Sequence, residues 1–271
     1  MISCLILGAG GAVPTPTHTP AAYWLVVDEH AVLLDPGPGA LVRLLASPRG
    51  PNSIDAIDSV LFSHLHLDHC ADLAPLLFAL HSPVLENSGS LHLIGPVGLQ
   101  HYLKGLRSLY GNWLTPAKRK LLVTEIQPGQ TLAPAIAGAA GWSVVSAATG
   151  PAIEVFAANH PQDNFCAESL CLRFRDRQGH RLVFSGDTES SPGLIEASRE
   201  ADLLVVECST PDEWAMRGHM TPERVGKLCA EAAPLRVVLT HLYPAAAALD
   251  LPALIKEYYG GPVIPATDGA Y

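Results

Sequence analysis

Metal-binding side chains are concentrated in residues 61–70, LFSHLHLDHC, where three histidines and one aspartate occur within six positions. His64 and His66 lie two positions apart, so their side chains project on the same side of an extended segment. Asp68 and His69 lie on the turn that follows. Imidazole and carboxylate groups suit Zn²⁺, with Mn²⁺ and Fe²⁺ as alternatives. The spacing therefore predicts a site that holds two divalent metal ions next to each other.

Four more side chains of metal-binding or acid–base type share one place in the pattern, the C-terminal end of an apolar run. They are His160 after IEVFAAN, Asp187 after RLVFSG, Glu207 at the end of ADLLVVE, and His241 after RVVLT. His64 likewise follows the apolar run SVLFS. Because α/β proteins build sites on the loops at strand ends, we expect these residues to converge at one edge of the sheets.

The elements that must position these residues are strands and amphipathic helices. An apolar stripe with helical spacing follows the histidines and consists of Leu73, Leu76, Leu77 and Leu80. Thr221 and Pro222 form an N-cap signal for a second helix, and a third is expected to begin near Pro192. Because strand-like runs separate these helices, the predicted fold class is α/β, or α+β, with layered sheets.

Length and composition predict one folded domain. The chain has 271 residues, of which 48% are hydrophobic and 16% charged, and we expect a single domain over residues 1–271. Its formal net charge of −9 disfavours broad binding to a nucleic-acid backbone, which needs lysine and arginine to neutralise phosphates. The six cysteines form no Cys-x-x-Cys pair, which excludes a zinc ribbon or a dithiol redox motif of that type.

Two segments bear on cellular location. The sequence MISCLILGAG has no basic leader before its apolar run, so no signal peptide is expected and the predicted location is cytoplasmic. Residues 126–153 carry no charge over a length that could cross a bilayer, but they contain several prolines and glycines. This composition favours strands and turns, so no membrane partner is predicted.

The order of the ligand-type residues resembles the metal-site motifs of the metallo-β-lactamase superfamily of binuclear hydrolases. The matching residues, in chain order, are His64, His66, Asp68, His69, His160, Asp187 and His241. The resemblance spans essentially the whole chain and implies a four-layer αββα sandwich with the site at one edge. It implies one metal held by His64, His66 and His160, and another held by Asp68, His69 and His241. Asp187 would bridge both metals, and Asp35 in LLDPG would brace the metal-binding loop.

Finer features resemble ribonuclease Z and its phosphodiesterase relatives. The segments LGAGGAVPTP, IGPVGLQHYL and ADLLVVECST carry this likeness. In those enzymes a glutamate and a histidine form an acid–base pair, which corresponds here to Glu207 and His219. This chain reads ECST and GHMT where the tRNA-processing enzymes usually have His-Glu-Ala-Thr and His-Ser-Thr. Only 27 positions separate His160 from Asp187, which leaves no room for the long basic arm that many bacterial ribonuclease Z enzymes insert there.

The expected activity is that of a metal-dependent hydrolase, with a phosphodiesterase that uses a metal-bridging hydroxide as the first choice. Asp68 would orient this hydroxide, His219 would stabilise the phosphorus centre or protonate the leaving alkoxide, and Glu207 would fix the His219 tautomer. The expected partner is a small phosphodiester or ester; structured RNA is disfavoured, and a homodimer is one assembly that the resemblance implies. The alternatives are a ribonuclease Z that processes tRNA 3′ ends, an ester, lactone or thioester hydrolase, and a non-catalytic metal-binding module.

Overall fold

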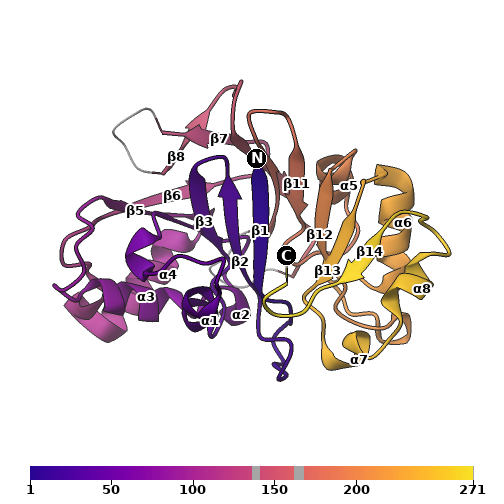
Figure 1. Ribbon diagram of the computed structural model, residues 1–271, viewed down its shortest axis with the longest axis horizontal. Helices are drawn as coiled ribbons and strands as arrows, with labels where there is room; N and C mark the ends of the chain where they lie inside the picture. The colour runs from indigo at the N-terminus through magenta and orange to yellow at the C-terminus, as the bar shows by residue number, and fades with distance from the viewer. Residues whose placement is uncertain (136–140, 162–167, 271) are drawn as a thin grey trace.

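The computed structural model describes residues 1–135, 141–161 and 168–270, which form two mixed β-sheets (Figure 1). The strands of the first sheet lie in chain order: β1 (Ile2–Gly8), β2 (Ala22–Val27), β3 (His30–Leu34), β4 (Ser59–Leu61), β5 (Ser90–Pro96) and β6 (Lys120–Ile126). Strands β1 to β3 are antiparallel neighbours, whereas β3 to β6 run parallel. The histidine-rich segment therefore begins at the C-terminal edge of a parallel strand, where sites are commonly built.

The second sheet also combines parallel and antiparallel strands. Its order is β14 (Val263–Pro265), β13 (Val237–Thr240), β12 (Leu203–Glu207), β11 (Arg181–Phe184), β10 (Leu170–Arg175), β9 (Ala152–Ala157), β7 (Thr131–Pro134) and β8 (Trp142–Val145). Strands β11 to β14 are parallel, and the remaining pairs are antiparallel. The uncharged segment 126–153 thus contains strands in its described part. No helix within the described ranges is long and apolar enough to cross a membrane.

Helices cover the outer face of each sheet (Figure 1). Those on the first sheet are α1 (Ala40–Ala46), α3 (Leu73–Leu80) and α4 (Leu99–Tyr110), and those on the second are α5 (Pro192–Ser198), α6 (Pro222–Ala232) and α8 (Leu251–Ile255). The shorter pieces are α2 (Leu67–Cys70), α7 (Pro244–Ala247), and the 3₁₀ turns η1 (Ile54–Ala56), η2 (Gly111–Leu114) and η3 (Asp212–Trp214). The predicted helices after the histidines, after Thr221 and near Pro192 are confirmed.

Side-chain caps fix where two of these helices begin. The Thr221 hydroxyl accepts a hydrogen bond from the Arg224 backbone N–H, and the Ser191 hydroxyl accepts one from Leu194. Each cap is followed by proline at the first helical position, which lacks the N–H that would otherwise be unpaired. The cap at Thr221 also fixes the chain just after His219.

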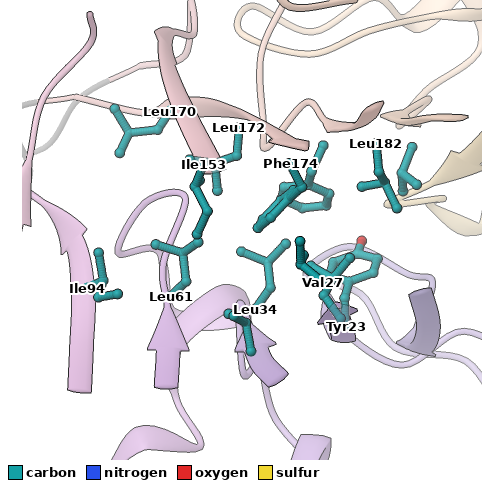
Figure 2. Close-up of a cluster of buried hydrophobic side chains, with 14 of the residues drawn as sticks. Tyr23, Val27, Leu34, Leu61, Ile94, Ile153, Leu170, Leu172, Phe174 and Leu182 are labelled. Atoms are coloured by element: carbon teal, nitrogen blue, oxygen red, sulfur yellow. The ribbon is translucent and has the colours of Figure 1, made fainter. Parts of the chain in front are cut away.

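Three hydrophobic cores separate the four layers. One core lies under the helices of the first sheet, a second lies between the sheets, and a third lies under the helices of the second sheet. In the middle core, Leu34 and Leu61 face Phe174 from the opposite sheet, and all three side chains are fully buried (Figure 2). This alternation confirms the two-sheet, helix-covered architecture expected from the sequence.

Hydrogen bonds join the two sheets along the edge where the ligand-type residues lie. The Leu170 N–H donates to the Ser63 carbonyl at 3.0 Å. The Tyr23 and Thr240 hydroxyls are 2.7 Å apart inside the protein. These contacts hold the ends of β4, β10 and β13 in one position relative to each other, so the loops that follow them start from a rigid base.

Candidate metal centre

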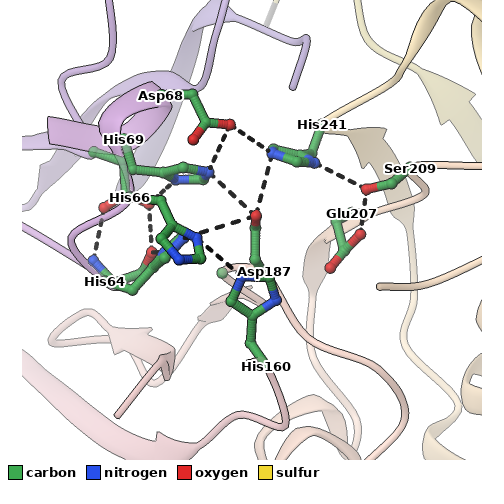
Figure 3. Close-up of polar contacts among 12 residues, drawn as sticks. His64, His66, Asp68, His69, His160, Asp187, Glu207, Ser209 and His241 are labelled. Carbon is green, nitrogen blue, oxygen red and sulfur yellow. Dashed lines mark hydrogen bonds and ion pairs between the residues drawn. The ribbon is translucent and has the colours of Figure 1, made fainter. Parts of the chain in front are cut away.

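The seven predicted ligands converge from both sheets (Figure 3). His64 and His66 lie in the loop after β4, whereas Asp68 and His69 lie on the short helix α2 and not on an open turn. The other three follow strands of the second sheet: His160 after β9, Asp187 after β11 and His241 after β13. The predicted convergence of strand ends is therefore seen, while metal binding by these side chains stays a prediction.

The first trio consists of three histidines whose ring nitrogens face one point. His66 Nδ1 lies 3.2 Å from His64 Nε2 and 3.1 Å from His160 Nε2. His160 Nδ1–H donates to the Gly218 carbonyl at 2.8 Å, so its Nε2 carries a lone pair. His64 Nδ1 is held in the same way at 3.0 Å from the Ser63 hydroxyl, which donates its own hydrogen to Asp35.

The second trio combines one carboxylate with two histidines. Asp68 Oδ2 lies 3.3 Å from His241 Nε2 and 3.7 Å from His69 Nε2. The far nitrogen of His69 bonds Asp35 at 2.9 Å, which confirms by geometry that Asp35 braces this loop. Each inner nitrogen is therefore fixed in direction by a partner on the other side of its ring.

Asp187 lies between the two trios. Its Oδ2 is 3.7 Å from His64 Nε2 and 3.2 Å from His241 Nε2, and its Oδ1 is 3.3 Å from His69 Nε2. The residue before it, Gly186, has a left-handed backbone with φ of 57°. This turn directs the carboxylate back into the cluster, in the place predicted for a bridging ligand.

The arrangement suits a cation. The Nε2 atoms of His64 and His160 carry lone pairs, and both lie 3.1–3.2 Å from His66 Nδ1, so three ring nitrogens are gathered where one positive charge could bind them all. In the other trio, His69 Nε2 is buried and has no hydrogen-bond partner among the described residues. Nitrogen and carboxylate donors of this kind fit a divalent transition-metal ion. The residues present therefore form a buried His/Asp cluster suited to metal binding.

Electrostatics keep the first trio in its ligand form. Burial lowers the pKa of His64 well below its usual range, and burial also lowers the pKa of His160. Burial opposes the charge on Asp187, yet the positive charge of nearby histidines, His241 first, holds its pKa well below the usual range. Neutral imidazole and ionised carboxylate are the protonation states that bind metal, and His64, His160 and Asp187 favour them. Burial also acts against the charge on His69, but the carboxylates around it prevail and raise its pKa, so His69 would release a proton when it binds a metal.

The two residues predicted to form an acid–base pair are in contact beside the cluster, and their catalytic role stays a prediction. His219 Nδ1 lies 3.1 and 3.2 Å from the two oxygens of Glu207, which is fully buried. Burial acts to lower the pKa of His219, but the hydrogen bond and negative charge of Glu207 prevail and raise it to about 9. The His219 ring packs 4.8 Å from the His160 ring, measured between centroids. Its second nitrogen is therefore near the cluster without being needed to complete either trio.

Comparison with known proteins agrees with this geometry. A family model described as a β-lactamase superfamily domain matches residues 30–242. The chain belongs to the metallo-β-lactamase superfamily. Within the superfamily, an uncharacterized protein of Mycobacterium leprae (strain TN) is 30% identical over 268 residues, which are 97% of this chain and 86% of that protein.

Two further members of the metallo-β-lactamase superfamily resemble the chain along most of its length. Ribonuclease Z of Methanosarcina acetivorans is 26% identical, over 89% of this chain and 88% of that enzyme. The crystal structure of the metallo-β-lactamase fold protein YhfI from Bacillus subtilis has a TM-score of 0.78 at 24% identity, with 99% and 98% of the two chains covered. The superfamily and the fold expected from the sequence are thereby confirmed.

Two supports of this metallo-β-lactamase site were not foreseen from the sequence. The Ser209 hydroxyl donates to Glu207 and accepts from His241 Nδ1 at 2.9 Å, so it links the acid–base pair to one trio. Its only signal is its position two residues after Glu207. The Gly218 carbonyl that holds His160 could not be predicted from the sequence, because every residue has a backbone carbonyl.

Among the described residues, two of the five non-glycine residues with positive φ lie at this site. Asp35 and His241 have φ of 46° and 54°, in the left-handed region that non-glycine residues seldom occupy. Each follows a parallel strand and turns sharply, which points its side chain into the cluster. Strain of this kind persists where the surrounding structure determines it, and it is typical of functional sites.

Proposed function

We propose that this protein is a metal-dependent phosphodiesterase that holds two divalent ions, with Zn²⁺ as the first choice and Mn²⁺ or Fe²⁺ as alternatives. The observation that carries the proposal is the Glu207–His219 pair, which adds a proton donor to a cluster already complete without it. When bound, divalent ions would activate a water molecule and neutralise charge on a phosphoryl oxygen. His64, His66 and His160 would hold one ion, Asp68, His69 and His241 the other, and Asp187 both.

The chain's own residues supply orientation and protons. Asp68 keeps 14% of its side chain exposed, whereas Asp187 keeps 4%, so the Asp68 carboxylate is the more open one and can accept a hydrogen bond from an attacking water. His219 donates Nδ1–H to Glu207, which leaves Nε2 to deliver a proton to the leaving oxygen. An alkoxide is a poor leaving group, and a positioned general acid typically accelerates its departure by about 10²–10⁴-fold.

The charge of the protein and the length of one chain segment favour a small substrate. The similarity to an enzyme named ribonuclease Z supports phosphodiester chemistry. A net charge of −9 and the short interval between His160 and Asp187 favour a small diester over a structured tRNA. A metal cluster of this type could also polarise an acyl carbonyl, so an ester, lactone or thioester is the competing substrate class.

One assay separates these substrate classes. Metal-stripped protein is reloaded with Zn²⁺ or Mn²⁺ and given bis(4-nitrophenyl) phosphate, 4-nitrophenyl acetate and a γ-lactone in parallel. We expect metal-dependent turnover with kcat/KM highest for the diester. Ester or lactone turnover well above diester turnover would refute the phosphodiesterase proposal and favour an acyl hydrolase.

A further inference from the structure

A small polar pocket lies directly beside the first trio. It has a volume of about 250 Å³ and is lined by Asn159, His160, Pro161, Glu189, Arg217 and Gly218. His160 is a predicted ligand, and Gly218 is the residue whose carbonyl holds it. Arg217 and Gly218 also directly precede His219 in the chain. The pocket therefore adjoins one predicted ligand, His160, and the segment of backbone that leads to His219.

We propose that this pocket binds a second anionic group of the substrate, such as a terminal phosphate, with the Arg217 guanidinium as its counter-charge. The inference rests on the proposed function, because it assigns the part of the substrate that does not react. It predicts that the preferred substrates carry a phosphomonoester or carboxylate next to the diester that is cleaved.

Among the described residues that line the pocket, Arg217 is a cation without an acidic partner. Glu189, the acid in the wall, is neutralised by Arg224 at 3.4 Å and also accepts a hydrogen bond from the Asn159 side chain at 3.0 Å. Arg224 is in turn held by the His219 carbonyl at 2.6 Å, so it is committed to the framework. Arg217 is exposed and makes no hydrogen bond or ion pair within residues 1–135, 141–161 and 168–270.

The chemistry of these groups matches a phosphate or carboxylate. A free guanidinium presents a planar fork of N–H donors that binds two oxygens of one anion. The Asn159 amide uses one N–H for Glu189 and has a second N–H available to a ligand. In a protein of net charge −9, a cation that has no acidic partner within the described residues would attract the anionic end of a substrate to this pocket.

Equilibrium binding tests the inference without relying on turnover. Thymidine 3′,5′-bisphosphate, thymidine 5′-monophosphate and thymidine 3′-monophosphate are titrated into the Zn²⁺-loaded protein by calorimetry. We expect the bisphosphate to bind about tenfold more tightly than either monophosphate, with the difference decreasing at high salt. Arg217→Ala should abolish the difference and leave monophosphate affinity unchanged, whereas Arg217→Lys should keep part of it.

Arg236→Ala serves as the charge-matched control, because Arg236 is exposed and lines a different pocket, next to Met1 and Asp202. It should bind the three nucleotides as the unaltered protein does. The inference would be overturned if the unaltered protein showed no preference for the bisphosphate. It would also be overturned if the ratio of bisphosphate to monophosphate affinity were the same in the Arg217→Ala and unaltered proteins. Turnover of bis(4-nitrophenyl) phosphate, which lacks a second anionic group, reports separately on the phosphodiesterase proposal.

Discussion

His219 and Asp68 both lie at the cluster, but they have different neighbours, and we expect different effects when each is replaced. Asp68 belongs to a trio, whereas His219 is held by Glu207 outside both trios. We expect Asp68→Ala to lose metal and activity together. His219→Ala should keep its metal content, measured by atomic absorption, while kcat falls by about 10²–10⁴-fold. Loss of metal in the His219 variant would show that His219 is a ligand.

Ser209 supports His241 from outside the cluster. Its hydroxyl is the partner of His241 Nδ1, so Ser209→Ala leaves that nitrogen buried and unpaired. Removing such an outer partner typically weakens metal affinity by about 10–100-fold. The dissociation constant for Zn²⁺, measured by competition with a chromophoric chelator, should rise accordingly. Ser209→Thr keeps the hydroxyl and should restore affinity; an alanine variant with native affinity would exclude this role.

The turn before α1 sets the position of α2. A Cβ added at Gly37 would lie 2.0 Å from the Asp68 carbonyl oxygen and 2.7 Å from that of Ala21. Both contacts are with backbone, so Gly37→Ala must displace the loop that carries Asp68. We expect a loss of unfolding free energy of about 1–3 kcal/mol together with weaker metal binding, measured by urea unfolding and metal titration.

A second glycine supplies the control for that substitution. Gly105 lies inside α4, and a Cβ there would meet nothing within 4 Å. Gly105→Ala should therefore leave metal binding unchanged and stabilise the protein by up to about 1 kcal/mol, because alanine favours a helix. Equal effects of the two substitutions would contradict the contact assigned to Gly37.

The turn between β10 and β11 contains a pH-sensitive pair far from the cluster. The buried Asp176 carboxylate accepts hydrogen bonds from the His180 N–H and Nδ1, each at 2.9 Å, and this bond to Asp176 raises the pKa of His180. A histidine with a raised pKa stabilises the fold below its unfolded value of about 6.5, and this contribution is lost as pH rises through the folded pKa.

Asp176→Asn tests the direction of that shift. The amide keeps the size of the side chain but removes its charge, so the pKa of His180, followed by NMR titration, should fall toward its ordinary value. The stability advantage of the unaltered protein over this variant should be smaller at pH 8.5 than at pH 6, as far as His180 contributes. An unchanged pKa of His180 in the variant would show that Asp176 does not raise the pKa of His180.

The sequence predicted the helices and strands that have a clear residue pattern or cap. It did not predict contacts that backbone groups make, because these do not depend on residue type. The leucine stripe of α3 and the Thr221 cap of α6 predicted both helices, and the strand-end positions of His160 and His241 predicted that both lie in the cluster at one edge of the sheets. Helix α2 was missed because four residues are too few to show a period. The Gly218 carbonyl was missed because carbonyls do not differ among residue types.

At the scale of the whole molecule, metal binding should stabilise the pairing of the two sheets. One trio draws His160 from the second sheet and the other draws His241, while their remaining members follow β4 of the first. A ligand that binds only the folded state stabilises it by about 2.7 kcal/mol at 100 times its dissociation constant. Zn²⁺ should therefore raise Tm by several degrees in calorimetry, and EDTA should reverse the effect.

Asp187→Asn should remove most of this rise in Tm, because Asp187 contacts both trios. The substitution removes one charge and little volume, so the metal-free variant should still unfold cooperatively. A Zn²⁺-induced rise in the variant equal to that of the unaltered protein would mean that the metal stabilises the fold from some other place.

Contacts at the site and beside it join residues that are far apart in the chain. Tyr23 and Thr240 are 217 positions apart, and Asp68 and His241 are 173 apart. During synthesis on the ribosome, the histidine-rich segment emerges well before its partner His241, which follows β13. A truncated or stalled chain therefore has incomplete ligand sets and no rigid edge on which to hold them. A fragment that ends before His241 therefore contains only one of the two trios in full.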